Sequence, residues 1–306
     1  MSTDPRWEVP ASLRPAYESC RQITQEHART YYLAASLLPT ERRPHVWALY
    51  AFARVSDDIV DEPSAQPGPA LAAWRAAALD AVAAAGPAPD PATAPVLAAL
   101  RRTAECLGLG SGPFEEFLDS MAMDLTVTEY PTWADLRVYM RGSAAVIGEM
   151  TAPLLGATDP AALPRAGALG EAFQLTNFVR DIAEDRRRGR TYLPLEDLAR
   201  YGVTVADLDE CVQTRRPTPA VRRLVADEVD RAFDLYEEAR PGLAMVDTRA
   251  KPCVDVAFEL YRRILVEIRK ARYDVFARRI SVPTLARGAA VLGAFSRYAR
   301  LGPTRP

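Results

Sequence analysis

Two stripes of acidic and amide side chains, each set in an otherwise apolar helical pattern, are the residues of this sequence best placed to do chemistry. The first stripe consists of Asp57 and Asp61. The second stripe has the spacing i, i+3, i+7 and i+11, and its members are Gln174, Asn177, Asp181 and Asp185. Because an α-helix has about 3.6 residues per turn, the members of each stripe share one helical face.

Like charges on one helical face repel each other, so both stripes require a compensating cation. Carboxylate and amide oxygens that face each other from two helices form a site that suits Mg²⁺. In proteins, Mg²⁺ commonly accompanies a phosphorylated substrate. The two stripes therefore predict a magnesium site that binds a phosphate or diphosphate group.

The first stripe also has a simpler explanation. It lies at the end of a predicted helix, before a proline- and glycine-rich segment at 62–69. Carboxylates in the last turn of a helix cost about 0.3–1 kcal/mol each against the helix dipole. A solvated helix end of this kind is common, and Arg54 is spaced to form an ordinary ion pair with Asp57 or Asp58.

The second stripe favours the metal site. Asn and Gln add little to an exposed helical face, whereas their neutral amide oxygens ligate a cation without adding charge. The basic run from Arg186 to Arg190 follows this stripe. This run is explained either as a basic helix end capped by Gly189 or as a cationic rim for a departing diphosphate.

Composition excludes several other functions. The chain has 306 residues, of which 49% are hydrophobic, so it can bury a large core. A net charge of −2 argues against a nucleic-acid partner. Its four cysteines are widely spaced and its two histidines are His27 and His45, which excludes a site with three histidine ligands. We found no signal peptide and no apolar run long enough to span a membrane, and we expect a cytoplasmic protein that can reach the inner membrane face.

Helical periodicity dominates, with no convincing strand pattern, and predicts an all-α chain that forms one domain over residues 1–306. Proline-rich breaks at 62–69, 86–91 and 216–219 are too short for interdomain linkers. The predicted helices cover 17–38, 42–61, 70–85, 91–107, 114–125, 133–155, 164–187, 219–240, 251–277 and 283–299.

Taken in order, the motifs resemble those of the squalene/phytoene synthase family over nearly the whole chain. They are His27-Ala-Arg-Thr30-Tyr31, Tyr50-x3-Arg54-x2-Asp57-Asp58-x2-Asp61, the segment from Tyr139 to Gly148, Gln174-x2-Asn177-x2-Arg180-Asp181-x3-Asp185, Arg190-Thr-Tyr192-Leu-Pro194 and Tyr261-x2-Ile-Leu-x3-Arg269. The segment 139–148 is most similar to bacterial phytoene synthases. The resemblance implies an isoprenoid-synthase-type helical bundle around a central apolar cavity.

The resemblance also implies a reaction. Two molecules of geranylgeranyl diphosphate condense head to head to phytoene through a cyclopropyl diphosphate intermediate, with release of diphosphate. The implied cofactor is Mg²⁺, with Mn²⁺ as a substitute, and no NADPH is expected. The first alternative is a synthase that uses farnesyl diphosphate to make squalene, dehydrosqualene or a hopanoid precursor. A non-catalytic helical assembly factor is the more distant alternative. Long hydrocarbon substrates further imply peripheral association with a membrane.

Individual roles follow from the same resemblance. The expected metal ligands are Asp57, Asp61, Asn177, Asp181 and Asp185. The expected substrate-binding residues are His27, Thr30, Tyr50, Arg54, Gln174, Asn177, Arg180, Tyr261 and Arg278. The expected catalytic set is Asp57, Asp61, Asp181, Asp185, Arg54 and Tyr261. Two positions depart from the family pattern: Ala28 stands where many relatives have a hydroxyl residue, and Arg141 stands where many have tyrosine. The second departure leaves the product open.

Overall fold

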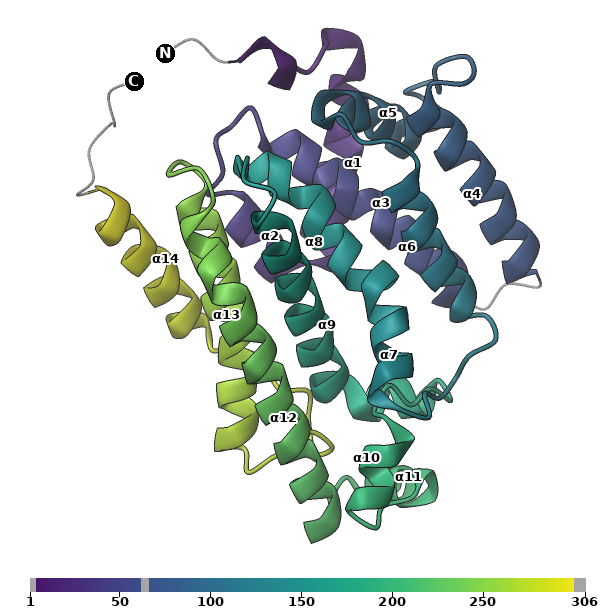
Figure 1. Cartoon of the computed structure of the whole chain (residues 1–306), viewed down its shortest axis with the longest axis vertical. Helices are drawn as coiled ribbons and strands as arrows, with labels where there is room; N and C mark the ends of the chain where they lie inside the picture. Colours follow the sequence, from purple (N-terminus) through teal and green to yellow (C-terminus); the bar gives the residue numbers. More distant parts are fainter. Residues whose placement is uncertain (1–3, 62–65, 300–306) are drawn as a thin grey trace.

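The computed structural model describes residues 4–61 and 66–299, and these ranges form a bundle of α-helices (Figure 1). The all-α prediction is confirmed, and the described ranges contain no strand beyond an isolated bridge between Glu129 and Thr191. The helices are α1 (Arg14–His27), α2 (Arg29–Ala35), α3 (Arg43–Asp61), α4 (Pro67–Ala83), α5 (Pro95–Leu107), α6 (Gly112–Met123), α7 (Trp133–Met140), α8 (Val146–Thr151), α9 (Ala162–Arg187), α10 (Leu195–Arg200), α11 (Val205–Thr214), α12 (Pro219–Ala239), α13 (Lys251–Lys270) and α14 (Thr284–Ala299).

Helix α9 lies in the middle of the bundle, with α8, α12 and α13 packed against it (Figure 1). Its apolar side chains, among them Leu175 and Val179, are fully buried. One contiguous hydrophobic cluster extends from Trp7 to Ala294. Helix α9 therefore presents its polar stripe from a rigid, densely packed position.

A buried hydrogen-bond network fixes helix α3, which carries the first stripe, to α1 and α5. The Nδ1 atom of His45 lies 3.1 Å from the Tyr17 hydroxyl and 3.0 Å from the Thr103 hydroxyl. All three side chains are buried. Because buried polar groups are costly unless they are paired, this network defines the position of the α3 N-terminal half.

Three predicted helices are interrupted or shortened in the structure. The helix predicted for 17–38 breaks at Ala28, whose backbone leaves the helical region with φ −135° and ψ 62°. The helix predicted for 133–155 contains a π-helical turn, Arg141–Ala145, between α7 and α8. In that turn Gly142 approaches α6 so closely that an added Cβ would lie 2.4 Å from the Glu116 carbonyl oxygen. The helix predicted for 251–277 ends at Lys270, because Arg272 and Tyr273 have positive φ angles.

Helices α10 and α11 were not predicted, because both are too short to show helical periodicity. A local signal for α11 does exist in the sequence. The Thr204 hydroxyl accepts from the Asp207 backbone N–H, and the Asp207 carboxylate accepts from the Thr204 N–H, which forms a capping box. Within the described ranges, no helix has the length and hydropathy needed to cross a membrane.

Candidate active site

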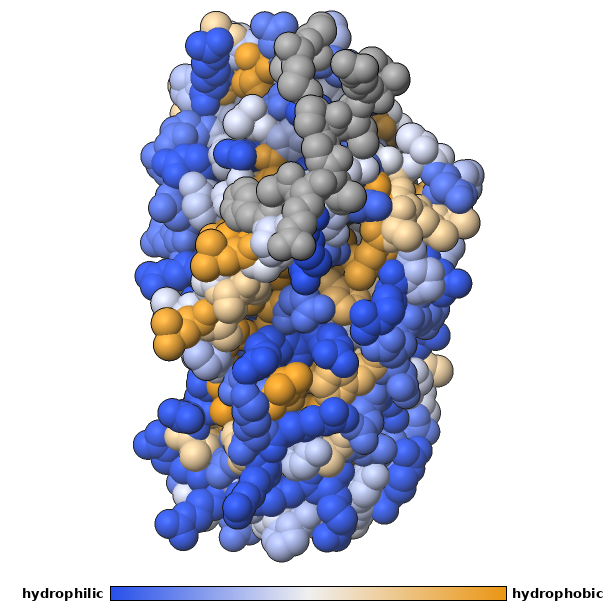
Figure 2. All heavy atoms as spheres, turned by 90° about the vertical axis from the view of Figure 1, so that its left-hand side faces the viewer, coloured by the Kyte–Doolittle hydropathy of each residue, from blue (hydrophilic) through white to orange (hydrophobic). Residues whose placement is uncertain are grey.

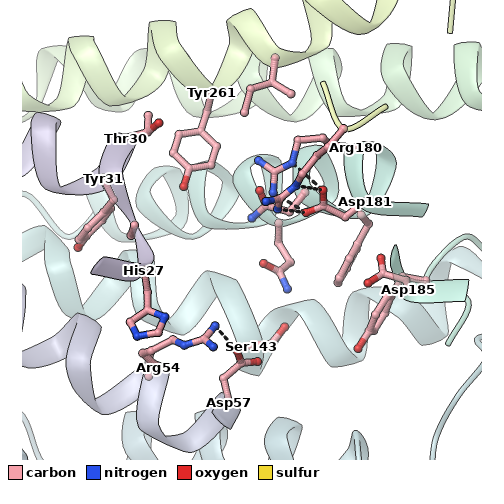
Figure 3. A pocket seen from close by; sticks show the side chains of 18 of the residues that line it. His27, Thr30, Tyr31, Arg54, Asp57, Ser143, Arg180, Asp181, Asp185 and Tyr261 are labelled. Atoms are coloured by element: carbon pink, nitrogen blue, oxygen red, sulfur yellow. Dashed lines mark hydrogen bonds and ion pairs between the residues drawn. The ribbon is translucent and has the colours of Figure 1, made fainter. Parts of the chain in front are cut away.

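A cavity of about 820 Å³ brings the two stripes together between α2, α3, α9 and α13 (Figure 3). Its volume lies within the range of about 300–1,000 Å³ typical of small-molecule sites. Most of the residues predicted from the sequence line it: His27, Thr30, Tyr50, Arg54, Asp57, Gln174, Asn177, Arg180, Asp181, Asp185 and Tyr261. Asp61 and Arg278 are not among the lining residues.

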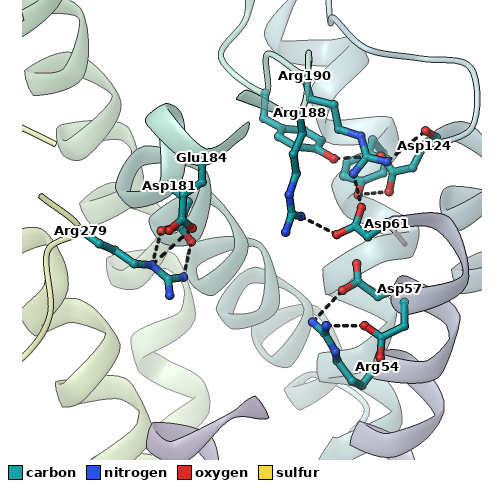
Figure 4. A network of polar contacts seen from close by, with 12 residues as sticks. Arg54, Asp57, Asp61, Asp124, Asp181, Glu184, Arg188, Arg190 and Arg279 are labelled. Atoms are coloured by element: carbon teal, nitrogen blue, oxygen red, sulfur yellow. Dashed lines mark hydrogen bonds and ion pairs between the residues drawn. The ribbon is translucent and has the colours of Figure 1, made fainter. Parts of the chain in front are cut away.

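On the α3 side, Arg54 pairs with two neighbouring carboxylates of the same helix. Its Nη1 atom lies 3.1 Å from Asp57, and its Nη2 atom contacts Asp58 (Figure 4). The ordinary intrahelical ion pair considered from the sequence is therefore present. Burial and the nearby Asp61 raise the pKa of Asp57 to about 6. A cation in the cavity would therefore favour the ionised form of Asp57.

Asp61 is held by arginines that follow the second stripe. Its carboxylate accepts from Arg188 at 2.6 Å and from Arg190 at 2.5 Å (Figure 4). Both arginines line the cavity, as a cationic rim would. Arg186, in contrast, pairs with Asp209 at 2.9 Å and has a structural role. Arg188 and Arg190 therefore lie where a cationic rim was expected, and Arg186 does not.

On the α9 side, the two aspartates of the second stripe differ in charge state. Burial disfavours ionisation of Asp181, but hydrogen bonds from Arg180 at 2.8 Å and from Arg279 at 2.9 Å hold its pKa below the usual value. Among the residues that the structure describes, none donates a side-chain hydrogen bond to Asp185. Burial and the neighbouring Asp181 raise the pKa of Asp185 to about 8. A cation that reaches both carboxylates would remove this cost.

Aromatic rings form much of the remaining cavity lining. Phe178 stacks on Tyr192 with ring centroids 4.1 Å apart, and Tyr261 stacks on Phe173 at 4.2 Å. Burial raises the pKa of Tyr261, so its hydroxyl stays neutral. Besides Phe178, the apolar lining residues are Ala28, Ala53, Phe117, Met121, Ile264, Ile280 and Val282. The cavity that was expected to be apolar thus combines a charged region with an aromatic and aliphatic one.

Tertiary packing places further polar residues in or next to the cavity that sequence reasoning missed. Asp124, at the C-terminal end of α6, accepts hydrogen bonds from Tyr139 at 2.7 Å and Tyr192 at 3.0 Å. Burial raises the pKa of Asp124 to about 6, although both hydroxyls oppose the shift. Arg190 also donates to the Asp124 carbonyl oxygen. Asp124 is an isolated acid in the sequence, so no spacing pattern could have identified it. Unpredicted polar residues that line the cavity include Tyr31, Ser143 and Arg279.

The structure differs from the expectation at Arg278, and it also places Arg141 and Ala28, the two departures from the family pattern. Arg278 does not line the cavity, whereas the adjacent Arg279 does and pairs with Asp181. The reason is that the segment after α13 is not helical, so the helical register assumed for 251–277 does not apply. Arg141 points away from the cavity, where it pairs with Glu116 at 2.7 Å and with Glu149. Ala28, in contrast, does line the cavity.

The oxygen donors present suit Mg²⁺ or Mn²⁺. Within the described ranges, no three Asp, Glu, His or Cys side chains lie close enough to form a metal cage by themselves. Mg²⁺ is usually bound through one or two carboxylates together with substrate phosphates, which is the pattern that two separate stripes offer. The residues therefore fit a metal that is shared with a diphosphate.

Comparisons with known proteins agree with the fold. Residues 24–286 match the squalene/phytoene synthase family. A 15-cis-phytoene synthase of Synechococcus elongatus is 37% identical over 90% of both chains. A phytoene synthase of Arthrospira platensis is 36% identical over 93% of this chain and 94% of its own.

Solved structures give the same result. A dehydrosqualene synthase with bound ligand superposes with a TM-score of 0.84 at 29% identity, covering 94% of this chain and 98% of its own. A squalene synthase from Alicyclobacillus acidocaldarius superposes with a TM-score of 0.77 at 32% identity, covering 89% and 99% of the two chains. The motifs, the helical bundle and these relatives together establish that the chain belongs to the squalene/phytoene synthase family.

Proposed function

We propose that this protein condenses two molecules of geranylgeranyl diphosphate head to head to form phytoene, with release of diphosphate. Its relatives identify it as a prenyltransferase, and the two compared over about nine-tenths of the chain are phytoene synthases. The observation that carries the proposal is the convergence of Asp57, Asp181 and Asp185 on one cavity that also has an aromatic lining.

The residues that would hold Mg²⁺ are Asp57 and Asp61 on α3, and Asn177, Asp181 and Asp185 on α9. When bound there, the metal would neutralise the charge that develops on a leaving diphosphate. Burial raises the pKa of Asp57 and of Asp185, and a cation bound between them would favour the ionised form of both carboxyl groups.

Arginine side chains of this chain complete the diphosphate site. Arg54 on α3 and Arg180 on α9 face the cavity from opposite sides, and Arg279 reaches it from the segment before α14. Guanidinium groups bind phosphate oxygens through paired, charge-assisted hydrogen bonds. They would hold the diphosphate groups of both substrates and stabilise the diphosphate as it departs.

The aromatic region would handle the carbocation. Loss of diphosphate leaves an allylic cation, which the double bond of the second substrate captures, and loss of a proton then closes the cyclopropane ring of the cyclopropyl diphosphate. Departure of the second diphosphate, rearrangement and loss of a second proton give phytoene. The faces of Phe178, Tyr192 and Tyr261 can stabilise positive charge, and the buried rings exclude water that would quench the cation. No reductant is required for phytoene. Because substrate and product are long hydrocarbons, we also propose peripheral association of this otherwise cytoplasmic protein with a membrane.

The second candidate function is condensation of farnesyl diphosphate. The superposed solved structures, a dehydrosqualene synthase and a squalene synthase, favour it. The distinguishing experiment is incubation of the purified protein with Mg²⁺ and either diphosphate, with and without NADPH, followed by analysis of the extracted hydrocarbons. We expect a C40 product from geranylgeranyl diphosphate without NADPH. A C30 product alone would move the assignment to the second candidate, and absence of any hydrocarbon would contradict both.

A further inference from the structure

Helix α14 has an apolar face that packs against the bundle and another that faces outward. Small residues four apart, Ala286, Ala290 and Ala294, face the core. On the opposite side, Leu285 is 90% exposed and Leu292 is 71% exposed. These two leucines are seven residues apart and therefore share one helical face. They are the two most exposed large hydrophobic side chains of the described ranges.

The charge of this region differs from that of the rest of the chain. From Val275 to Ala299 the sequence contains Arg278, Arg279, Arg287 and Arg297 but no Asp or Glu, although the whole chain has 40 acidic residues. Among the described residues, neither Arg278 nor Arg287 forms an ion pair with a carboxylate, whereas Arg279 pairs with Asp181 and Arg297 lies 3.7 Å from Asp255. Figure 2, which views the molecule from the α14 side, shows hydrophobic and hydrophilic groups side by side on this face.

The position of α14 connects this face to the cavity. Ile280, Ser281 and Val282, directly before the helix, line the cavity, as does Arg287 within its first turn. Arg29 and Thr30 of α2 line the same cavity. Any lipid surface that met the outer face of α14 would therefore lie next to the cavity that receives the prenyl chain.

We propose that α14 is a docking helix for an anionic lipid surface. It would lie flat on the bilayer, with Leu285 and Leu292 inserted below the headgroups and Arg278 near the lipid phosphates. An apolar stripe in a segment that carries four arginines and no acid, with Arg278 beside it unpaired within the described ranges, suits such a surface better than an uncharged partner. The inference rests on the proposed function, because the long prenyl substrates explain why the protein would bind a membrane. The docking surface itself is identified from α14 alone.

The test is co-sedimentation of the full-length protein with vesicles of phosphatidylcholine alone or with added phosphatidylglycerol. The test variant is Leu285→Ser/Leu292→Ser. The matched control is Val138→Ser/Leu163→Ser, because these side chains are 65% and 41% exposed but do not belong to α14. We expect wild type and control to bind anionic vesicles, and the α14 variant to bind at least tenfold less. We also expect high salt to reduce binding, and equal melting temperatures for all three proteins.

Binding of the α14 variant equal to that of wild type would overturn the proposal. So would a change from dimer to monomer in the α14 variant by light scattering, because the leucines would then form an interface between two copies. Turnover measurements distinguish a failure of the docking proposal from a failure of the proposed function. The α14 variant should keep wild-type turnover of detergent-solubilised substrate and lose turnover of vesicle-delivered substrate. A protein that binds vesicles through α14 yet makes no hydrocarbon would refute the proposed function alone.

Discussion

At the scale of single residues, arginine side chains form ion pairs with carboxylates of both stripes. Asp61 lies between Arg188 and Arg190, and Asp181 accepts from Arg279. A diphosphate that arrives with its metal would therefore take over the arginines, while the metal takes over the carboxylates. Both exchanges conserve charge pairs, so the site can open for substrate without leaving a buried charge unpaired.

The contribution of the Asp181 carboxylate to turnover can be measured against that of another acid on the same helix. We predict that Asp181→Asn lowers kcat by roughly 10²–10³, the cost of removing one group that stabilises charge in a transition state. Glu184→Gln is the control, because Glu184 lies on the same helix, is exposed and does not line the cavity. Steady-state hydrocarbon formation at saturating Mg²⁺ measures both. Equal rates for the two variants would refute the metal-ligand role.

Arg278 and Arg279 offer a comparison between adjacent arginines. We predict that Arg279→Gln raises KM for the prenyl diphosphate about tenfold, the effect of one lost charge-assisted contact, whereas Arg278→Gln leaves KM within about twofold of wild type. Initial rates over a range of substrate concentrations with detergent-solubilised substrate give both values. A larger effect at Arg278 would restore the placement expected from the sequence.

Residue spacing explains which site residues could be predicted. Asp57, Asn177, Asp181 and Asp185 lie on regular helices, so their shared faces followed from their spacing. Arg279 was missed because it follows a break that ends α13. Asp124 was missed because only the packing of α6 against the Tyr139 and Tyr192 rings brings it to the site.

At the scale of elements, helix α3, which carries the first stripe, is held to α1 and α5 by a network that includes the neutral side chain of His45. Burial lowers the pKa of His45 to about 4, compared with about 6.5 in an unfolded chain. Between these pH values the unfolded chain binds a proton that the folded protein does not. The network therefore stabilises the fold fully above pH 6.5 and loses up to about 3 kcal/mol as the pH falls to 4.

The prediction is that His45→Gln flattens this part of the pH dependence. Its free energy of unfolding should be lower than that of wild type at pH 7, and the difference should shrink at pH 4.5. Denaturant unfolding at the two pH values measures this directly. A wild type and a variant that lose equal stability between pH 7 and pH 4.5 would show that His45 does not titrate as described.

Long helices with strong periodicity, such as α3 and α9, were predicted to within a few residues. The interruptions at Ala28 and at Arg141–Ala145 could not be predicted, because they depend on how neighbouring helices meet. Gly142, for example, allows the π-helical turn to touch α6, and nothing in its local sequence reveals that contact.

At the scale of the whole molecule, the sequence predicted a helical bundle around a cavity, and the structure and the relatives agree. Family membership rests on ordered motifs spread from His27 to Arg269. The length of the prenyl chain is set by which side chains meet across helices, and sequence spacing carries no information about that depth. The product assay is therefore needed to identify which prenyl diphosphate the protein uses. A structure with bound ligand, in contrast, can show where the diphosphate group binds.

The most direct test of the central claim is a crystal structure with Mn²⁺ and a geranylgeranyl thiodiphosphate, whose bridging sulfur resists ionisation. The anomalous signal of Mn²⁺ locates the metal independently of the protein. We predict Mn²⁺ peaks that bridge the diphosphate to Asp57 or Asp61 on one side and to Asn177, Asp181 or Asp185 on the other. A diphosphate held by arginines alone, or Mn²⁺ bound away from both stripes, would contradict the account.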